Sequence, residues 1–108
     1  MSTGLLGAVD LAALTETALY APAVGERASV KVVFANRNSG LSARVRVVLR
    51  PGAGPTAPED YLAFDEVVPV NESRVSAVFD MENPQELLVE SDASSVTAQA
   101  NGIERDVV

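Results

Sequence analysis

Apolar and polar residues alternate along several short stretches of this chain, as they do in half-buried β-strands. Over most of residues 44–50, aliphatic side chains on one face alternate with arginines on the other, and in residues 74–80 Val75, Ala77 and Phe79 share one face. The residues predicted to face inward are Val45, Val47, Leu49, Val75, Ala77 and Phe79. We therefore expect Val47 and Phe79 to lie in the core.

Five further segments are strand candidates, namely 17–21, 30–36, 61–68, 86–90 and 95–103, and residues 30–36 are rich in β-branched and aromatic side chains. Turn-forming Gly, Pro and Asn residues separate the segments, and the longest linker is Pro51–Pro58. Short strands with turn signals between them are typical of β-sandwiches. The sequence therefore predicts an all-β, immunoglobulin-like antiparallel β-sandwich of about seven strands.

The first 14 residues are rich in Gly, Ala and Leu. We predict an N-terminal arm at residues 1–14, followed by a single domain at residues 15–108. A first edge strand and a short helix over Val9–Leu14 are alternatives. The arm holds four leucines, Leu5, Leu6, Leu11 and Leu14. Because each buried leucine contributes roughly 1.5–3 kcal/mol, the arm should cover either the core of its own domain or a neighbouring subunit.

The amino-acid composition limits the kinds of catalytic and metal-binding site that the chain can form. The chain has 108 residues, which fits one domain, and it contains neither Cys nor His. Disulfides, thiolate metal sites and the commonest general base are therefore excluded. Asp60, Asp65 and Glu66 lack the dense spacing of a calcium loop, so solvated strand ends are the favoured interpretation. We expect a protein that is not an enzyme, with no catalytic, cofactor-binding or metal-binding residues.

Charge is distributed unevenly around a net value of −7. Residues 1–54 carry six basic and three acidic side chains, whereas residues 55–108 carry two basic and twelve acidic ones. This asymmetry favours pairing within the domain or head-to-tail contacts between copies. We expect no nucleic-acid partner, because such partners favour basic domains. No apolar run is long enough to span a bilayer, and the N-terminus lacks the basic segment of a secretion signal.

Three arginines, Arg44, Arg46 and Arg50, share the polar face of one predicted strand. Two interpretations remain open. The stripe docks on an acidic partner, or it pairs with carboxylates of a neighbouring strand, such as Glu86 and Glu90. Such cross-strand pairs contribute about 0.2–1 kcal/mol each. Together with the four leucines of the arm, these arginines are the predicted protein interface.

Several short motifs follow one another along the chain in an order that is also found in a known group of proteins. They are Gly4-Leu5-Leu6-Gly7, Ala18-Leu19-Tyr20-Ala21-Pro22-Ala23, Gly25–Val30, Val33-Phe34-Ala35-Asn36-Arg37, Asp60–Asp65, Val68–Asn71 and Asn101-Gly102-Ile103-Glu104. In this arrangement, which covers nearly the whole chain, the sequence resembles small Ig-like structural proteins of tailed bacteriophages. It departs from their pattern at Ala21-Pro22-Ala23-Val24-Gly25, where the proline comes one residue early.

The resemblance implies a virion protein made in the host cytoplasm, with no catalytic residues. The first expectation is a capsid decoration (cement) protein that binds the major capsid protein or other virion proteins and stabilises the capsid lattice. A homo-oligomer, such as a trimer, would suit this role. A tail- or fibre-associated domain is the second expectation. A stand-alone carbohydrate-binding or adhesion module is the rival class.

Overall fold

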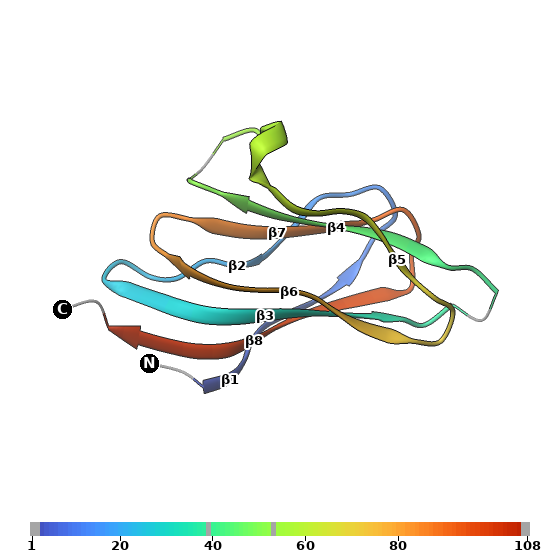
Figure 1. Cartoon of the computed structure of the whole chain (residues 1–108), viewed down its shortest axis with the longest axis horizontal. Helices are drawn as coiled ribbons and strands as arrows, with labels where there is room; N and C mark the ends of the chain where they lie inside the picture. The colour runs from blue at the N-terminus through green and yellow to red at the C-terminus, as the bar shows by residue number, and fades with distance from the viewer. Residues whose placement is uncertain (1–2, 39, 53, 107–108) are drawn as a thin grey trace.

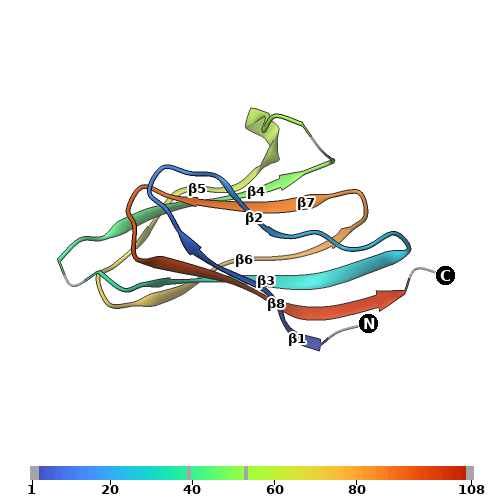
Figure 2. The ribbon, with the colours of Figure 1, turned by 180° about the vertical axis from the view of Figure 1, so that it is seen from behind.

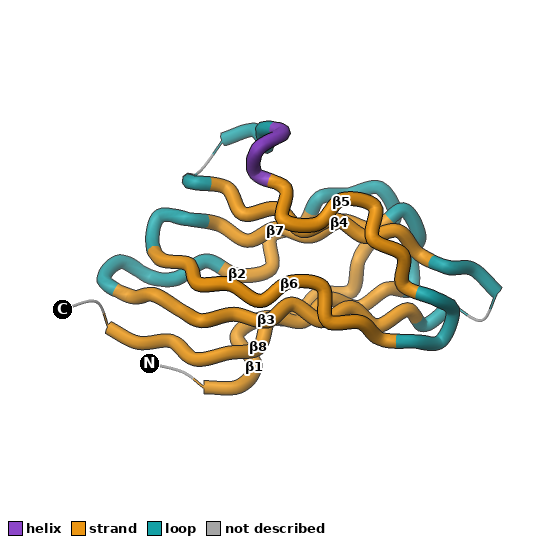
Figure 3. The backbone as a smooth tube through the Cα atoms, viewed as in Figure 1, coloured by secondary structure: helices purple, strands orange, loops and turns teal. Residues whose placement is uncertain are grey.

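The computed structural model describes residues 3–38, 40–52 and 54–106. Strands dominate this part of the chain, and a single turn of 3-10 helix interrupts them (Figures 1 and 3). In chain order the elements are β1 (Thr3–Leu11), β2 (Thr17–Tyr20), β3 (Glu26–Asn36), β4 (Ala43–Arg50), η1 (Pro58–Asp60), β5 (Tyr61–Val68), β6 (Ser73–Glu82), β7 (Glu86–Ser91) and β8 (Val96–Asp106). All seven predicted strand segments are confirmed.

The strands form two antiparallel four-stranded sheets packed face to face. Sheet A has the order β1-β8-β3-β6, and sheet B has the order β2-β7-β4-β5. Strands pair from the chain ends inward: β1 with β8, β2 with β7, β3 with β6 and β4 with β5. The chain thus forms one long hairpin rolled into two layers. Figure 2 shows the side on which the chain passes from β1 in sheet A to β2 in sheet B.

The predicted all-β antiparallel sandwich is confirmed, and its connectivity is that of an eight-stranded jelly roll. This connectivity differs from the expected immunoglobulin-like type, in which the last two strands share a sheet. Here β7 lies in sheet B and β8 in sheet A. The alternation that predicts each strand depends only on the burial of one face of the sheet. Strands of both folds bury one face, so the alternation does not distinguish the jelly roll from the immunoglobulin-like sandwich.

The core lies between the sheets and consists of aliphatic side chains around Phe34, which is fully buried. Val47 is fully buried, as predicted. Phe79 is partly buried and packs against the rim of the core. Val75 was expected on the same inward face, but it is exposed. The reason is a register shift between β3 and β6 near Val75, which reverses the phase of the strand.

The predicted N-terminal arm is instead an edge strand of sheet A. Residues Thr3–Leu11 form β1 and pair with β8, so no helix forms over Val9–Leu11. Leu11 is only 2% exposed and belongs to the core. The backbone hydrogen bonds of β1 and the burial of Leu11 attach this segment to its own sandwich, so the domain begins well before residue 15.

A buried asparagine closes one end of the sandwich. The Asn36 side chain donates to the carbonyl oxygens of Leu41 (2.8 Å) and Val68 (3.1 Å), and it accepts from the backbone N–H of Asn38. Burying an amide is costly unless it is hydrogen-bonded, and these bonds meet that cost. Asn36 therefore ties the turn after β3 to the end of β5.

Candidate functional site

The outer face of sheet B carries the three arginines, and two of them pair within the chain. Arg50 Nη2 donates to Glu86 Oε1 at 2.9 Å, and its Nη1 lies 4.0 Å from Glu16 Oε1. Arg46 Nε donates to Asp65 Oδ1 at 2.7 Å. Arg44 is exposed, and within the described ranges it forms no ion pair. Two of the three arginines therefore pair with carboxylates of their own chain.

A bulge in β5 explains the Arg46 pair. Between the partners of Val45 and Val47, β5 inserts an extra residue, and Asp65 adopts a positive φ of 56°. This geometry brings the Asp65 carboxylate to Arg46, whose guanidinium lies 4.0 Å from the centre of the Phe64 ring. The hydrogen bond to Asp65 raises the pKa of Arg46 further above its ordinary value. The guanidinium thus covers one face of the aromatic ring.

The same face of sheet B holds a small second cluster of buried side chains. Val48 and Leu88 are buried, although they do not belong to the central core. The loop that contains η1 lies over this side of the sheet, away from sheet A (Figure 1). Thr56 Oγ1 donates to the carboxylate of Glu16 at 2.9 Å and so helps to hold the loop. The outer face of sheet B is therefore partly covered by its own chain.

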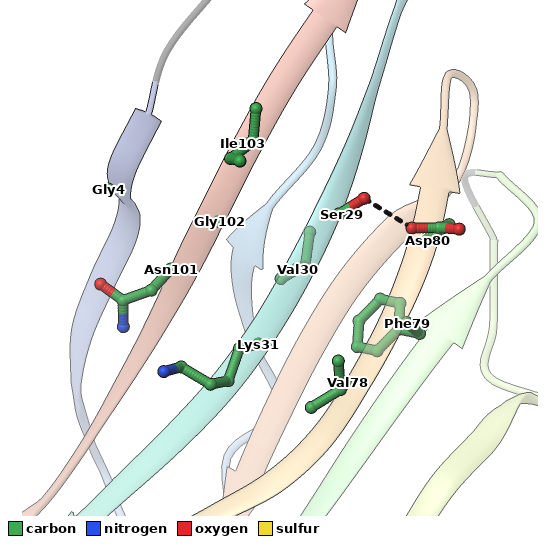
Figure 4. A pocket seen from close by; sticks show the side chains of 10 residues that line it. All are labelled: Gly4, Ser29, Val30, Lys31, Val78, Phe79, Asp80, Asn101, Gly102 and Ile103. Carbon is green, nitrogen blue, oxygen red and sulfur yellow. Dashed lines mark hydrogen bonds between the residues drawn. The ribbon is translucent and has the colours of Figure 1, made fainter.

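The outer face of sheet A carries a groove with exposed aliphatic side chains among polar ones. Exposed aliphatic side chains on this face come from three strands, namely Leu5 of β1, Val75 and Val78 of β6 and Ile103 of β8, and the half-buried Val33 of β3 lies on the same face. Among them runs a groove of about 540 Å³. Figure 4 shows the residues that line it, with the Lys31 side chain among the aliphatic ones. Exposed apolar surface of this kind is typical of interaction sites.

Gly102 shapes the floor of this groove. A Cβ atom at this position would lie 1.8 Å from the carbonyl oxygen of Ser29. No side chain fits there unless β8 and β3 shift apart. On the far side of β3, the Ser29 hydroxyl donates to Asp80 at 2.7 Å.

The four leucines of the predicted arm divide between the two sides of β1 and the turn after it. Leu6 and Leu11 face the core of their own domain. Leu5 is 59% exposed beside the groove, and Leu14 is exposed in the turn between β1 and β2. Of these leucines, Leu5 therefore lies on the outer face of sheet A, whereas Leu6 and Leu11 are not available to a partner on that face.

Edge strands are a second place where partners attach, since they offer unpaired backbone groups. In this chain each edge strand, β1, β2, β5 or β6, has a register shift where it pairs with its neighbour. The two interior pairs, β3 with β8 and β4 with β7, are regular. Such irregularities hinder the addition of another strand. Contact through a face is therefore favoured over contact through an edge.

A cross-sheet contact joins β2 to β8. The Tyr20 hydroxyl donates to the Glu104 carboxylate. Burial, followed by this hydrogen bond and by the charges of Glu104 and Glu26, raises the pKa of Tyr20 well above its ordinary value. The neutral phenol is therefore the form that the fold stabilises.

Two of the three acidic residues considered as calcium ligands have other partners. Asp60 accepts a hydrogen bond from the backbone N–H of Ala57, and Asp65 pairs with Arg46. Within the part of the chain that the structure describes, no three His, Cys, Asp or Glu residues are grouped as metal ligands. None of the helical structure described there is long and apolar enough to cross a membrane.

Sequence reasoning missed the groove residues Lys31, Val78 and Ile103. A signal was present in the sequence, because Val78 and Ile103 are apolar residues at outward positions of their strands.

Comparisons of the chain with models of protein families, with curated proteins and with solved structures find no match.

Proposed function

We propose that this protein is a non-enzymatic structural protein of a phage virion, most specifically a capsid decoration protein that binds and stabilises the capsid lattice. The observation that carries the proposal is the groove on the outer face of sheet A, where aliphatic side chains are exposed. Leu5, Val78 and Ile103 lie exposed there with a groove between them. A surface of this kind gains free energy when another protein covers it.

Two further features support contact with proteins. The irregular edge strands hinder the addition of another strand, and this favours contact through a sheet face. The jelly-roll fold is common in viral capsid proteins, although it also occurs in lectins, so this support is by analogy. A protein that binds only the assembled capsid stabilises assembly over dissociation, and many copies on one particle turn weak contacts into firm attachment.

The rival function, binding of carbohydrate, finds less support. Sugar-binding surfaces commonly use an open aromatic ring as a platform. The exposed aromatic residue Phe64 has the Arg46 guanidinium over its ring at 4.0 Å, and the Tyr61 ring packs against it edge-on with centroids 5.0 Å apart. These neighbours occupy the ring surface that a sugar would stack on.

Co-sedimentation tests the proposal. Purified protein is mixed with capsids of the phage that encodes it, and bound protein is measured after centrifugation. We expect saturable binding and a higher temperature of capsid disassembly when the protein is bound. A glycan array run with the same preparation tests the rival. Binding to glycans together with no binding to capsids would overturn the proposal.

A further inference from the structure

Strand β1 is the lateral edge of sheet A. It pairs with β8, and no strand lies beyond it in the sheet. Its side chains Leu6, Val9 and Leu11 pack on the core between the two sheets. Residues 12–16 form the whole connection from β1 to β2. The position of β1 therefore depends on one line of backbone pairing, three apolar side chains and a short turn.

That turn is strained. Residues 12–16 take the chain from sheet A to sheet B (Figure 2). Leu14, in the middle, has a φ of 58°, a left-handed conformation that costs free energy for a leucine. Its side chain is 73% exposed, so burial of the leucine does not offset this cost. A short, strained connection favours domain swapping, because it straightens when the strand pairs with another copy.

The place that β1 occupies fits few other segments. We name it the β1 slot and define it as the free edge of β8 together with Leu19 of β2. A Cβ atom at Gly7 would lie 2.2 Å from the carbonyl oxygen of Leu19, so the occupant needs a glycine at that point. It also needs apolar side chains where Leu6 and Leu11 enter the core. Every copy of the chain carries such a strand in β1, and this fit selects a second copy without any appeal to charge.

We propose that two copies of this chain exchange β1, so that β1 of each copy occupies the β1 slot of the other. The exchanged contacts are those made within one copy, and only residues 12–16 change conformation. Residues 12–15 are exposed, so extending them disrupts no core packing, and Leu14 no longer needs a positive φ. The inference does not depend on the virion assignment, because it rests on β1 and its connection alone.

One bond opposes the exchange. The Leu14 N–H donates to the carbonyl oxygen of Ser91 at 2.8 Å, and straightening the turn breaks this hydrogen bond. On average a backbone hydrogen bond contributes less to net stability than a left-handed leucine costs. The balance therefore favours the exchanged form once the concentration of copies is high.

Variants of the connection test the role of Leu14. Leu14→Gly removes the strain of the closed monomer, because glycine adopts a positive φ freely. We expect the association constant of the dimer to fall at least about tenfold. Ser95→Gly is the matched control, since Ser95 also has a positive φ, of 61°, but lies in the turn between β7 and β8, which the exchange leaves unchanged. This control should associate like the wild type.

Deletion of residues 13–14 should act in the opposite direction. It shortens a turn that already needs a left-handed residue, so the closed monomer becomes harder to form and the dimer should be the main species. Each protein is unfolded and refolded at millimolar concentration, and circular dichroism checks that it is folded. Analytical ultracentrifugation then measures the mass against the 11.3 kDa monomer.

Engineered cysteines test where β1 lies in the dimer. Ala8 of β1 and Gln99 of β8 are directly opposite each other and exposed, and the chain has no cysteine of its own. Ala8→Cys and Gln99→Cys are made in separate proteins, which are refolded together and oxidised. Opposite residues of paired strands are close enough for a disulfide, so exchange should give a covalent dimer on a denaturing gel. Ala8→Cys mixed with Arg44→Cys, on the outer face of sheet B, measures random linkage and should give only background.

The inference is overturned if the refolded wild type stays monomeric, if Leu14→Gly associates as strongly as the wild type, or if dimers form without the link between residues 8 and 99. Capsid binding separates this failure from failure of the proposed function. A monomer that co-sediments with capsids contradicts only the exchange of β1. A protein that exchanges β1 but does not bind capsids contradicts only the virion assignment.

Discussion

Both outer faces of this sandwich carry apolar side chains, and the two faces differ in whether the rest of the chain covers those side chains. On sheet B, Val48 and Leu88 point away from the central core and yet are buried, because the loop around η1 and its polar contacts lie over that side. On sheet A, Leu5 and Val78 are equally apolar, but nothing in the described chain covers them.

The difference favours sheet A as the surface that contacts the partner we propose. Arginines look like the natural docking residues of this chain, but Arg46 and Arg50 use their charges on Asp65 and Glu86. Partly exposed pairs such as Arg46–Asp65 contribute little to stability or binding. The aliphatic side chains of sheet A have no such internal partner, so the free energy of covering them is available to another protein.

A matched pair of leucines gives the largest expected contrast in stability. Leu88→Ala on sheet B should lower the free energy of unfolding by about 2–5 kcal/mol, because it leaves a cavity beneath the loop. Leu5→Ala on sheet A should change it by no more than about 0.5 kcal/mol, since that side chain is already in solvent. Urea titration followed by circular dichroism measures both. Equal losses would show that the two faces are covered alike.

A glycine of β8 beside the groove gives the next effect. Gly102→Ala places a Cβ against the Ser29 carbonyl, so β8 and β3 must shift apart. We expect a loss of about 1–3 kcal/mol in the free energy of unfolding. Gly40→Ala is the control, because a Cβ there meets open space. If both changes are neutral in thermal denaturation, the close approach of β8 and β3 is not required.

The arginines of sheet B should differ among themselves. Arg50 has a side chain only 17% exposed and bonds to Glu86, so Arg50→Gln should cost about 1–3 kcal/mol. Arg44→Gln, at an exposed and unpaired position, should stay within about 0.5 kcal/mol of the wild type. The same urea titration compares the two. A silent Arg50→Gln would mean that the pairing does not hold the loop.

A smaller, pH-dependent effect tests the contact between the sheets. Because the fold raises the pKa of Tyr20 above its ordinary value of 10.0, the folded state keeps the phenol neutral where the unfolded chain ionises it. The contribution of Tyr20 to stability is therefore complete below about pH 10 and declines as the pH rises above that value. Tyr20→Phe should remove this part of the decline. Identical stability profiles from pH 9 to 11, roughly the range around the Tyr pKa, would contradict it.

The sequence predicts the strands of this protein well, because burial of one face leaves a period of two in residues such as Val45 and Val47. It does not predict their connectivity, since pairing of β1 with β8 joins residues about a hundred positions apart in the chain. Bulges are also missed. The shift near Val75 turns an inward residue outward without any glycine or proline to mark it.

The candidate site was only partly predictable for a related reason. Leu5 and Leu6 look alike in the sequence, and only the pairing of β1 decides that Leu5 faces solvent and Leu6 the core. The groove around Lys31 combines residues of four strands, so it exists only once sheet A is assembled. The covering of Val48 depends on a loop that has no periodic pattern at all.

Retention on particles tests most directly the claim that sheet A, and not sheet B, meets the partner. Val78→Asp and Arg44→Asp each place one carboxylate at an exposed position, one on each outer face. Both proteins are bound to purified capsids, and the fraction retained after sedimentation is measured at low and high salt. The account predicts that Val78→Asp is lost at both salt concentrations, because the missing contact is apolar, and that Arg44→Asp is retained like the wild type. Loss of Arg44→Asp with retention of Val78→Asp would contradict it and assign the contact to the arginine face.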